Sequence, residues 1–212
     1  MAIDRVVHIV DDDDAVRESA ALLLEIAGYN VLTYASGVAF LEAVATASPG
    51  CVLLDIHMPQ MTGLEVQAVL RERGVVWPVI VLTGQGDIGI AVQAMKNGAF
   101  EFLEKPYQNE ILLGTIAEAF ERLESVIEEG ARAANAQALI ATLTPRELQI
   151  MQGLLGGLPN KLIAHELDLS VRTVVVYRAN VMDKLGARSL STAVRIAMAA
   201  GVQPLGSVRD ET

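Results

Sequence analysis

Five residues within the first 105 have side chains that could together transfer a phosphoryl group. They stand beside four short apolar runs: Asp11 and Asp12 follow the first, Asp55 ends the second, Thr83 ends the third and Lys105 follows the fourth. Short apolar runs bounded by polar residues are typical of buried β-strands. In a doubly wound parallel sheet, ligands bind outside the carboxyl ends of the strands. The spacing therefore predicts that these side chains meet at one rim of a sheet.

Such a rim suits phosphoryl transfer to a carboxylate. Crowded carboxylates repel one another, and a divalent cation relieves that repulsion. Mg²⁺ takes oxygen ligands from carboxylates, water and phosphate, so it is the expected cofactor. Asp55 can then act as the nucleophile. Because phosphoryl transfer depends mainly on positioning and charge neutralisation, Mg²⁺ and Lys105 would neutralise the phosphoryl oxygens, and the Thr83 hydroxyl would hydrogen-bond one of them.

Each of these residues also has an ordinary structural explanation. Residues 11–14 are four consecutive aspartates, which could form a solvated acidic run and cap a helix. Lys105 could be a surface lysine and Thr83 a turn residue. Their joint occurrence at four strand ends, in an order that fits the chemistry, favours the phosphoryl-transfer interpretation.

The elements that must position this rim are strands alternating with helices. Buried strands are expected at 6–10, 51–54, 79–82 and 99–103, with a weaker candidate at 30–34, and helices near 15–27, 37–47, 63–73 and 87–97. A fifth helical pattern follows Pro106. This alternation predicts a five-stranded parallel sheet with helices on both faces, the α/β flavodoxin-like doubly wound fold.

The helical pattern after Pro106 is long and changes character along its length. Its apolar residues recur at alternating spacings of four and three, which makes a short heptad seam: Leu112, Ile116, Ala119, Leu123 and Val126. Such a seam either packs only on its own sheet, or its end also joins a dimer or carries a signal between the domains. The apolar signal fades after the seam, and the Ala-rich residues 128–143 are predicted to be a partly helical linker.

A second domain is expected to begin at Thr144, a good N-cap. Pro145 suits the first helical position, and Glu147 completes a capping box. Gly156-Gly157 ends that helix. The expected caps of the three following helices are Asn160, Ser170 and Ser189. Four short helices, with a three-residue turn between the second and third, predict an all-α helix-turn-helix domain. The predicted domains are therefore residues 1–124 and 144–204, joined by a helical linker over 125–143.

Residues 1–124 resemble the receiver domains of two-component systems. The matching motifs are Asp11-Asp12, Leu54-Asp55-Ile56-His57-Met58-Pro59, Gly63, Thr83-Gly84 and Lys105-Pro106. The resemblance implies that Asp55 is the phosphoacceptor. It also implies that Mg²⁺ is bound by Asp11, Asp12, Asp55 and the backbone carbonyl of His57. Thr83 and Phe102 would be the switch residues: Thr83 moves toward the phosphoryl group and Phe102 turns inward.

Residues 144–203 resemble the DNA-binding domains of the LuxR/NarL class, and with the first domain they resemble its FixJ-like branch. The matching motifs include Leu143–Glu147, Gly157–Lys161 and Arg178–Leu185. The resemblance implies that the helix after Ser170 is the recognition helix. Its residues 173–176 are β-branched, which by propensity alone suggests a strand, but the caps and the flanking period favour a helix.

The recognition helix has two faces with different compositions. Val174, Val181 and Leu185 recur on one face and should pack on the domain core. On the other face, small apolar side chains can contact thymine methyl groups, and basic side chains can contact phosphates. The candidate DNA-binding residues are Lys161, Arg172, Thr173, Val175, Val176, Arg178, Ala179, Asn180 and Lys184. The chain departs from the common pattern at Val175, where a lysine is frequent, and at Tyr177, where a histidine is frequent.

These resemblances imply a two-component response regulator. A histidine kinase would phosphorylate Asp55, and the altered receiver would dimerise or release its DNA-binding domain. Two such domains would bind paired half-sites on double-stranded DNA and so regulate transcription. The protein would not be a turnover enzyme, because a receiver catalyses only its own phosphorylation and dephosphorylation.

Composition and charge fit this interpretation. Of the 212 residues, 52% are hydrophobic, enough for two cores. Residues 1–124 carry a net charge of −11 and residues 144–212 a net charge of +2, so only the second domain suits nucleic acid. No apolar run reaches the roughly 18 residues of a membrane span. The first residues do not resemble a secretory signal, and the single cysteine, Cys51, fits a buried thiol in a cytoplasmic protein.

Three other functions fit the sequence less well. Haloacid-dehalogenase phosphatases also use a nucleophilic aspartate, but they need a second aspartate where this chain has His57. A LuxR-type regulator of a diffusible signal needs an apolar ligand pocket, which an acidic rim with Lys105 matches poorly. A regulator that acts through protein contacts or phosphate buffering would have no DNA target. The predicted helix over 170–185 argues against that alternative, and an operator-binding assay would decide it.

Overall fold

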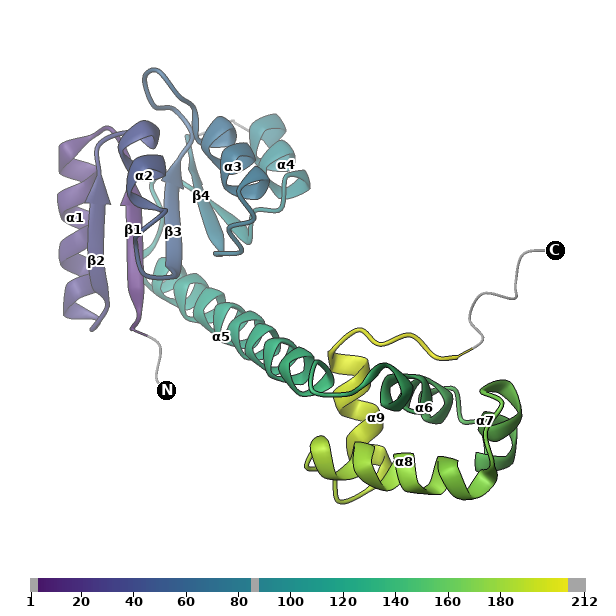
Figure 1. The fold of residues 1–212 in the computed structure, drawn as a ribbon. Helices are drawn as coiled ribbons and strands as arrows, with labels where there is room; N and C mark the ends of the chain where they lie inside the picture. The colour runs from purple at the N-terminus through teal and green to yellow at the C-terminus, as the bar shows by residue number, and fades with distance from the viewer. Residues whose placement is uncertain (1–3, 85–87, 206–212) are drawn as a thin grey trace. The chain divides into compact units, whose positions relative to one another are not determined.

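The computed structural model describes residues 4–84 and 88–205, and the chain divides into two compact units between Ile127 and Glu128 (Figure 1). The division falls inside the segment that the sequence predicts to link the domains. The first unit contains a parallel sheet with helices, and the second contains helices. Each unit has its own hydrophobic core.

The strands of the first unit form one parallel sheet in the order β2-β1-β3-β4-β5. Their bounds are β1 (Val6–Val10), β2 (Asn30–Tyr34), β3 (Gly50–Asp55), β4 (Val79–Thr83) and β5 (Glu101–Glu104). The flavodoxin-like prediction is confirmed. β5 begins two residues later than predicted, because the Ala99 amide bonds the Ala94 carbonyl at the end of the preceding helix and so belongs to a turn.

Five helices connect and follow these strands. They are α1 (Asp14–Ile26), α2 (Gly37–Ala43), α3 (Gly63–Glu72), α4 (Ile88–Lys96) and α5 (Asn109–Ile140). Asp13 caps α1 by accepting hydrogen bonds from the amides of Ala15 and Val16, so one member of the aspartate run has the ordinary capping role. Thr62 and Glu65 form a capping box at α3.

The sheet has a core on each face, which explains why its strands are apolar at successive positions. On β3, Cys51 and Leu53 belong to one core, while Val52 and Leu54 belong to the other. The first core receives residues of α1 and α5, and the second receives residues of α2, α3 and α4. Burial raises the pKa of the Cys51 thiol, so this cysteine behaves as a small apolar side chain.

Helix α5 continues without interruption through the segment predicted to be only partly helical. Four of the five seam residues, Leu112, Ile116, Ala119 and Leu123, are buried in the core of the first unit. The packing of the seam on its own sheet is thereby confirmed for these residues. Farther along, Ala136 is buried, and Leu139 and Ile140 pack against the core of the second unit.

Besides the end of α5, the second unit contains four helices within the described residues: α6 (Pro145–Leu155), α7 (Asn160–Glu166), α8 (Val171–Lys184) and α9 (Leu190–Ala199). Thr144 and Glu147 form the predicted capping box, and Ser170 caps α8 as predicted. The predicted cap of α7 is wrong by one residue: Pro159 is the N-cap, and Asn160 is the first helical residue. No helix in residues 4–84 and 88–205 is long and apolar enough to span a membrane.

Candidate functional site

The five residues of the predicted rim lie at or just beyond the carboxyl ends of β1, β3, β4 and β5. The Lys105 Nζ donates hydrogen bonds to Asp11 Oδ2 and to Asp55 Oδ1, each at 2.6 Å. Asp11, Asp55 and Thr83 are buried, whereas Asp12 is exposed. The structure therefore joins two carboxylates and an ammonium group that lie 50 and 94 residues apart in sequence.

The backbone around Asp11 fixes its carboxylate. The Asp11 amide donates to the Tyr34 carbonyl at 3.2 Å, and Asp11 Oδ1 accepts from the Asp13 amide at 2.9 Å. The Arg17 guanidinium donates to the Asp11 carbonyl at 2.7 Å. Arg17 is a positioning residue that the sequence analysis missed. Its place in the first turn of α1, six residues after Asp11, was the only available signal.

The turn after β3 fits closely around Asp55. The Gly63 amide donates to the Ile56 carbonyl at 3.0 Å, which brings the start of α3 back onto the end of the strand. A Cβ atom at Gly63 would lie 2.3 Å from the Asp55 carbonyl oxygen. Only glycine fits there, so Gly63 serves to position Asp55. The side chain of His57, two residues after Asp55, is exposed.

Lys105 extends the hydrogen bonding of β4 and β5 beyond the sheet, because its amide donates to the Thr83 carbonyl at 2.8 Å. The following peptide bond, Lys105–Pro106, is cis. Burial by itself would lower the pKa of Lys105, but the hydrogen bonds and charges of Asp11 and Asp55 outweigh burial and raise it. The ammonium group therefore stays protonated and supplies one positive charge that the two carboxylates share.

The donor set of the rim suits a hard cation. Asp11 and Asp55 supply carboxylate oxygens, the ligand type that Mg²⁺ prefers, and they already hold one positive charge between them. Within residues 4–84 and 88–205, no three carboxylate, histidine or cysteine side chains are gathered closely enough to hold a metal ion. The exposed Asp12 carboxylate would have to turn toward the other two to complete a set of three.

Phe102, the predicted aromatic switch residue, is 41% exposed. Its side chain lines an apolar groove of about 400 Å³ between α4 and β5, together with Ala91, Val92, Met95 and Lys96. Thr83, its predicted partner in switching, is buried at the end of β4. The groove exposes apolar surface on the face that switching is expected to reshape.

Helix α8 presents two faces of the predicted kinds. Val174, Val181 and Leu185 are buried in the core of the second unit. Val175 and Val176 are 50% and 55% exposed. Arg172, Ala179 and Asn180 are also exposed. Thr173 is half-buried, and its hydroxyl hydrogen-bonds the Ser170 hydroxyl at 2.8 Å, so it contributes to the cap of the helix.

The basic residues of the second unit divide into two kinds. Lys161 and Arg172 are exposed and have no hydrogen bond or ion pair within the described residues. Arg178 donates to Asn160 Oδ1 at 3.3 Å, which links α8 to α7. Lys184 instead forms an ion pair with the buried Glu147, at 2.7 Å between Nζ and Oε2.

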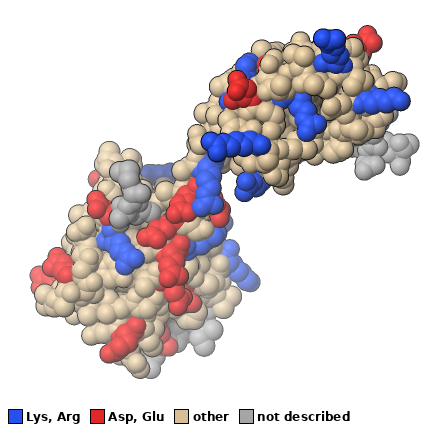
Figure 2. Space-filling view, turned by 90° about the horizontal axis from the view of Figure 1, so that it is seen from below, with Lys and Arg blue, Asp and Glu red and all other residues tan. Residues whose placement is uncertain are grey.

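The Glu147–Lys184 pair was not visible in the sequence, where Lys184 is a candidate for DNA contact. Hydrogen bonding from Lys184, followed by that from the Thr144 amide, lowers the pKa of Glu147. Lys184 also donates to the Thr142 carbonyl at 3.3 Å. This ammonium therefore stabilises the start of α6. Among the charged residues visible in Figure 2, Lys and Arg predominate on the second unit, whereas Asp and Glu form a band on the first.

Comparison with known proteins identifies both units. Residues 7–117 match the response regulator receiver domain family, and residues 141–197 match the luxR family of bacterial regulatory proteins. The transcriptional regulatory protein FixJ of Azorhizobium caulinodans is 47% identical over 199 residues, covering 93% of this chain and 94% of FixJ.

Solved structures agree over nearly the whole chain. The response regulator StyR has a TM-score of 0.80 at 38% identity, covering 92% of this chain and 98% of StyR. Full-length FixJ from B. japonicum has a TM-score of 0.60 at 44% identity, covering 94% of this chain and 98% of FixJ. The chain belongs to the FixJ-like two-component response regulators, in which a receiver domain is joined to a LuxR-family DNA-binding domain that regulates transcription.

Proposed function

We propose that phosphorylation of Asp55 by a histidine kinase controls DNA binding by the second unit. The observation that carries this proposal is the rim itself: the Asp55 carboxylate ends a buried strand and accepts a hydrogen bond from Lys105 at 2.6 Å. Low exposure keeps competing water away from the carboxylate, and an adjacent fixed cation can neutralise an incoming phosphoryl group.

In the proposed transfer, the Asp55 oxygen that Lys105 does not bind attacks the phosphorus of a phosphohistidine. A bond forms between this oxygen and phosphorus, the phosphorus–nitrogen bond breaks, and the histidine nitrogen leaves with the electron pair. Lys105 moves its hydrogen bond from Asp55 to a phosphoryl oxygen while keeping Asp11. The Thr83 hydroxyl donates to a second phosphoryl oxygen. Asp11 and Gly63 hold these groups in place.

Asp11, Asp12, Asp55 and the backbone carbonyl of His57 would hold Mg²⁺ at this rim. When bound, the ion supplies the positive charge that offsets the crowded carboxylate and phosphoryl oxygens. Small phosphoryl donors such as acetyl phosphate would serve in place of the kinase, because the receiver's own residues supply the chemistry. The same residues would later direct water to the acyl phosphate, which makes self-dephosphorylation part of the proposal.

The output of the switch would pass through the groove between α4 and β5. When Thr83 moves toward the phosphoryl group, it vacates space that Phe102 can fill. Turning Phe102 inward changes the apolar surface it shares with Val92 and Met95. This change favours a homodimer, which presents two DNA-binding units to paired half-sites. The protein would act in the cytoplasm, because that compartment holds the bacterial DNA.

On DNA, α8 would occupy the major groove. Lys161 and Arg172 are free to contact phosphates, which set the position of the helix but carry no sequence information. Val175, Val176 and Ala179 would contact base edges, and Asn180 would contact a base edge or the backbone. Arg178 can reach a phosphate only if it shares or gives up its bond to Asn160.

The test is labelling with acetyl phosphate and Mg²⁺, followed by intact mass, elution volume and operator binding. The wild type should gain one phosphoryl group, elute as a dimer and bind DNA more tightly. Asp55→Asn should show none of these changes. Asp4→Asn, the same substitution at an exposed position away from the rim, should behave as the wild type. An Asp55→Asn protein that is still labelled, or whose DNA binding still responds, would refute the proposal.

A further inference from the structure

A groove of about 670 Å³ lies at the amino ends of β4 and β5, the end of the sheet opposite the phosphorylation rim. Its walls come from the end of α3, the segment before β4, the turn between α4 and β5, and α5. Its lining includes four side chains with polar or aromatic groups: Gln67, Arg71, Trp77 and Arg122. The volume lies within the range of small-molecule sites, roughly 300–1,000 Å³.

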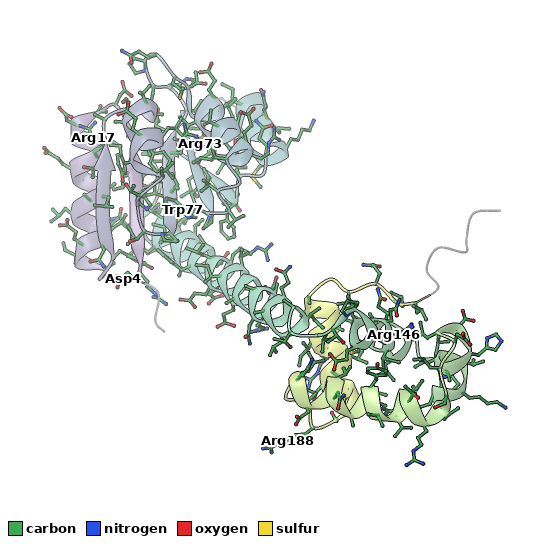
Figure 3. The ribbon with its side chains drawn as sticks, viewed as in Figure 1. Asp4, Arg17, Arg73, Trp77, Arg146 and Arg188 are labelled. Carbon is green, nitrogen blue, oxygen red and sulfur yellow. The ribbon has the colours of Figure 1, made fainter. Side chains whose placement is uncertain are left out.

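Trp77 gives the groove a fixed aromatic wall. The tryptophan lies just before β4 (Figure 3) and packs against the cores on both faces of the sheet. Its ring stacks on His8, with 4.9 Å between the ring centroids and 16° between the planes. His8 is itself held by hydrogen bonds to the Ser48 carbonyl and the Tyr34 hydroxyl. An apolar ring in the groove would therefore meet a surface that is already positioned.

Two arginines in this groove have no partner of their own. Arg71 and Arg122 are exposed and make no hydrogen bond or ion pair within residues 4–84 and 88–205. In the same unit, Arg17 and Arg73 donate to backbone carbonyls, and Lys105 binds two carboxylates. Two unpaired guanidinium groups beside one groove, in a unit with a large excess of acids, provide a site for an anion.

Gln67 supplies an unpaired acceptor in the same lining. Its side chain is 4% exposed, and its Nε2 donates to the Ala94 carbonyl at 3.0 Å, which fixes the orientation of the amide. The remaining oxygen, Oε1, has no donor, and no other buried side-chain nitrogen or oxygen atom of the described residues lacks a partner. Buried acceptors are nearly always satisfied by protein, water or ligand. Because Oε1 itself has almost no accessible surface, a hydroxyl or N–H group in the groove reaches it only after a shift of the surrounding side chains.

We propose that this groove binds a small organic anion: a flat apolar body that carries a carboxylate and a hydroxyl or amine donor. Arg71 and Arg122 bind the carboxylate, the body packs on Trp77, and the donor bonds Gln67 Oε1. This site is separate from the phosphorylation rim and does not depend on the function proposed above.

Trp77 is the only tryptophan in the chain, so its fluorescence reports on the groove alone. The probe is 3-hydroxybenzoate, which combines the three features of the proposed ligand. Calorimetry should show saturable binding to the full-length protein, and bound probe should protect Trp77 from quenching by acrylamide. The uncharged analogue 3-hydroxybenzamide should bind at least about tenfold more weakly, because it lacks the charge that the arginines recognise.

Substitutions locate the site. Arg71→Gln and Arg122→Gln should each weaken 3-hydroxybenzoate binding by about tenfold. Arg195→Gln, the same loss of charge at an exposed position of the second unit, should leave binding unchanged. In Gln67→Leu, the preference for 3-hydroxybenzoate over benzoate should disappear. The proposal fails if the wild type shows no saturable binding, if Trp77 gains no protection, or if both arginine variants bind as the wild type does. All variants should still be phosphorylated on Asp55, which separates this test from that of the switch.

Discussion

Lys161 and Lys184 show that two lysines of one small domain can have different roles. Both are natural candidates for phosphate contact in the sequence. In the structure, Lys161 has no partner within the described residues, whereas the ammonium group of Lys184 is paired with the buried Glu147. The pairing joins α6 to the end of α8 across 37 residues. No local pattern could have predicted it, because only the packing of the two helices brings the groups together.

Substitution of the two lysines should therefore affect different properties: operator binding for Lys161 and thermal stability for Lys184. Lys161→Gln should weaken operator binding and reduce the slope of log affinity against log salt by about 1, with unchanged thermal stability. Lys184→Gln should lower the melting temperature of the second unit, because Glu147 then stays buried without its partner. Gel-shift titrations at several salt concentrations and thermal melts measure both effects. If the Lys184→Gln variant instead had normal stability and a reduced salt slope, Lys184 would be a DNA-contacting residue and the prediction would be wrong.

His8 gives the first unit a dependence on pH. Burial lowers its pKa, while its hydrogen bond to the Ser48 carbonyl acts in the opposite direction. The folded state thus keeps His8 neutral at pH values where the unfolded chain is already protonated, near pH 6.5 and below. Because the unfolded state then binds more protons, the free energy of unfolding should fall as pH decreases below about 6.5, by at most about 1.4 kcal/mol per pH unit.

Urea unfolding followed by Trp77 fluorescence measures this dependence. The wild type should lose stability between pH 6.5 and its lower folded pKa, and His8→Gln should lack this component while being less stable at neutral pH. His57→Gln, which removes an exposed histidine of the same unit, serves as the control and should keep the wild-type slope. An unchanged slope in His8→Gln would mean that His8 is not the group that titrates.

At the scale of elements, the predictions were most accurate where local sequence decides the structure. β1 and β2 have the predicted bounds, and Thr144, Ser170 and Ser189 are N-caps as predicted. Capping is local, since it depends on a side chain and an amide two or three residues away. The errors arose where more distant contacts decide.

Two such errors lie in α7 and β5. Pro159, rather than Asn160, is the N-cap of α7, and Asn160 Oδ1 instead accepts a hydrogen bond from Arg178, 18 residues away. β5 starts late because Ala99 bonds the end of α4. The length of α5 was underestimated for the same reason: the Ala-rich segment has little periodicity of its own, but Leu139 and Ile140 gain packing partners in the core of the second unit.

Helix α8 carries a prediction about base recognition. Val175 and Val176 are half-exposed, and apolar side chains recognise thymine through its methyl group. Replacing a contacted thymine by uracil should weaken binding by roughly fourfold, the value of about 0.8 kcal/mol per buried methyl group. In the double variant Val175→Ala/Val176→Ala, replacing thymine by uracil should have no effect on binding at the positions that these two residues contact.

Competition binding with operators substituted one base at a time measures this coupling. Val38→Ala removes the same atoms from an exposed position of the first unit and should keep the full sensitivity to uracil. If the double variant remains as sensitive to uracil as the wild type, the two valines do not read thymine. Arg172 and Asn180 would then be the next residues to test for base contacts.

At the scale of the whole molecule, charge is divided as function requires. The first unit holds most of the acidic residues, some of which build the phosphorylation rim, whereas the second unit has a small positive excess (Figure 2). An acidic first unit is repelled by DNA, so the phosphates attract the second unit selectively. The division of charge thus assigns phosphorylation to the acidic first unit and DNA attraction to the second unit of the same chain.

The cores are divided in the same way, which predicts two unfolding transitions. The two cores of the sheet contain residues up to Ile127, whereas the core of the second unit begins at Leu139, so they share no residue. Ile80→Ala should destabilise only the first unit and Ile150→Ala only the second, each by about 2–5 kcal/mol, because both side chains are fully buried.

Thermal melts separate the two units because Trp77 lies in the first and is the only tryptophan. Its fluorescence should follow the first unit alone, while far-ultraviolet circular dichroism follows both. Ile80→Ala should lower the midpoint of the fluorescence transition. Ile150→Ala should leave that midpoint unchanged and lower only the midpoint of the second unit's transition, which circular dichroism detects. If either substitution moved both transitions together, helix α5 would couple the units into one cooperative body. Such coupling would favour a mechanism in which helix α5 transmits the phosphorylation signal as a rigid element. Two independent transitions would instead favour a mechanism in which phosphorylation changes only how the separately folded units associate.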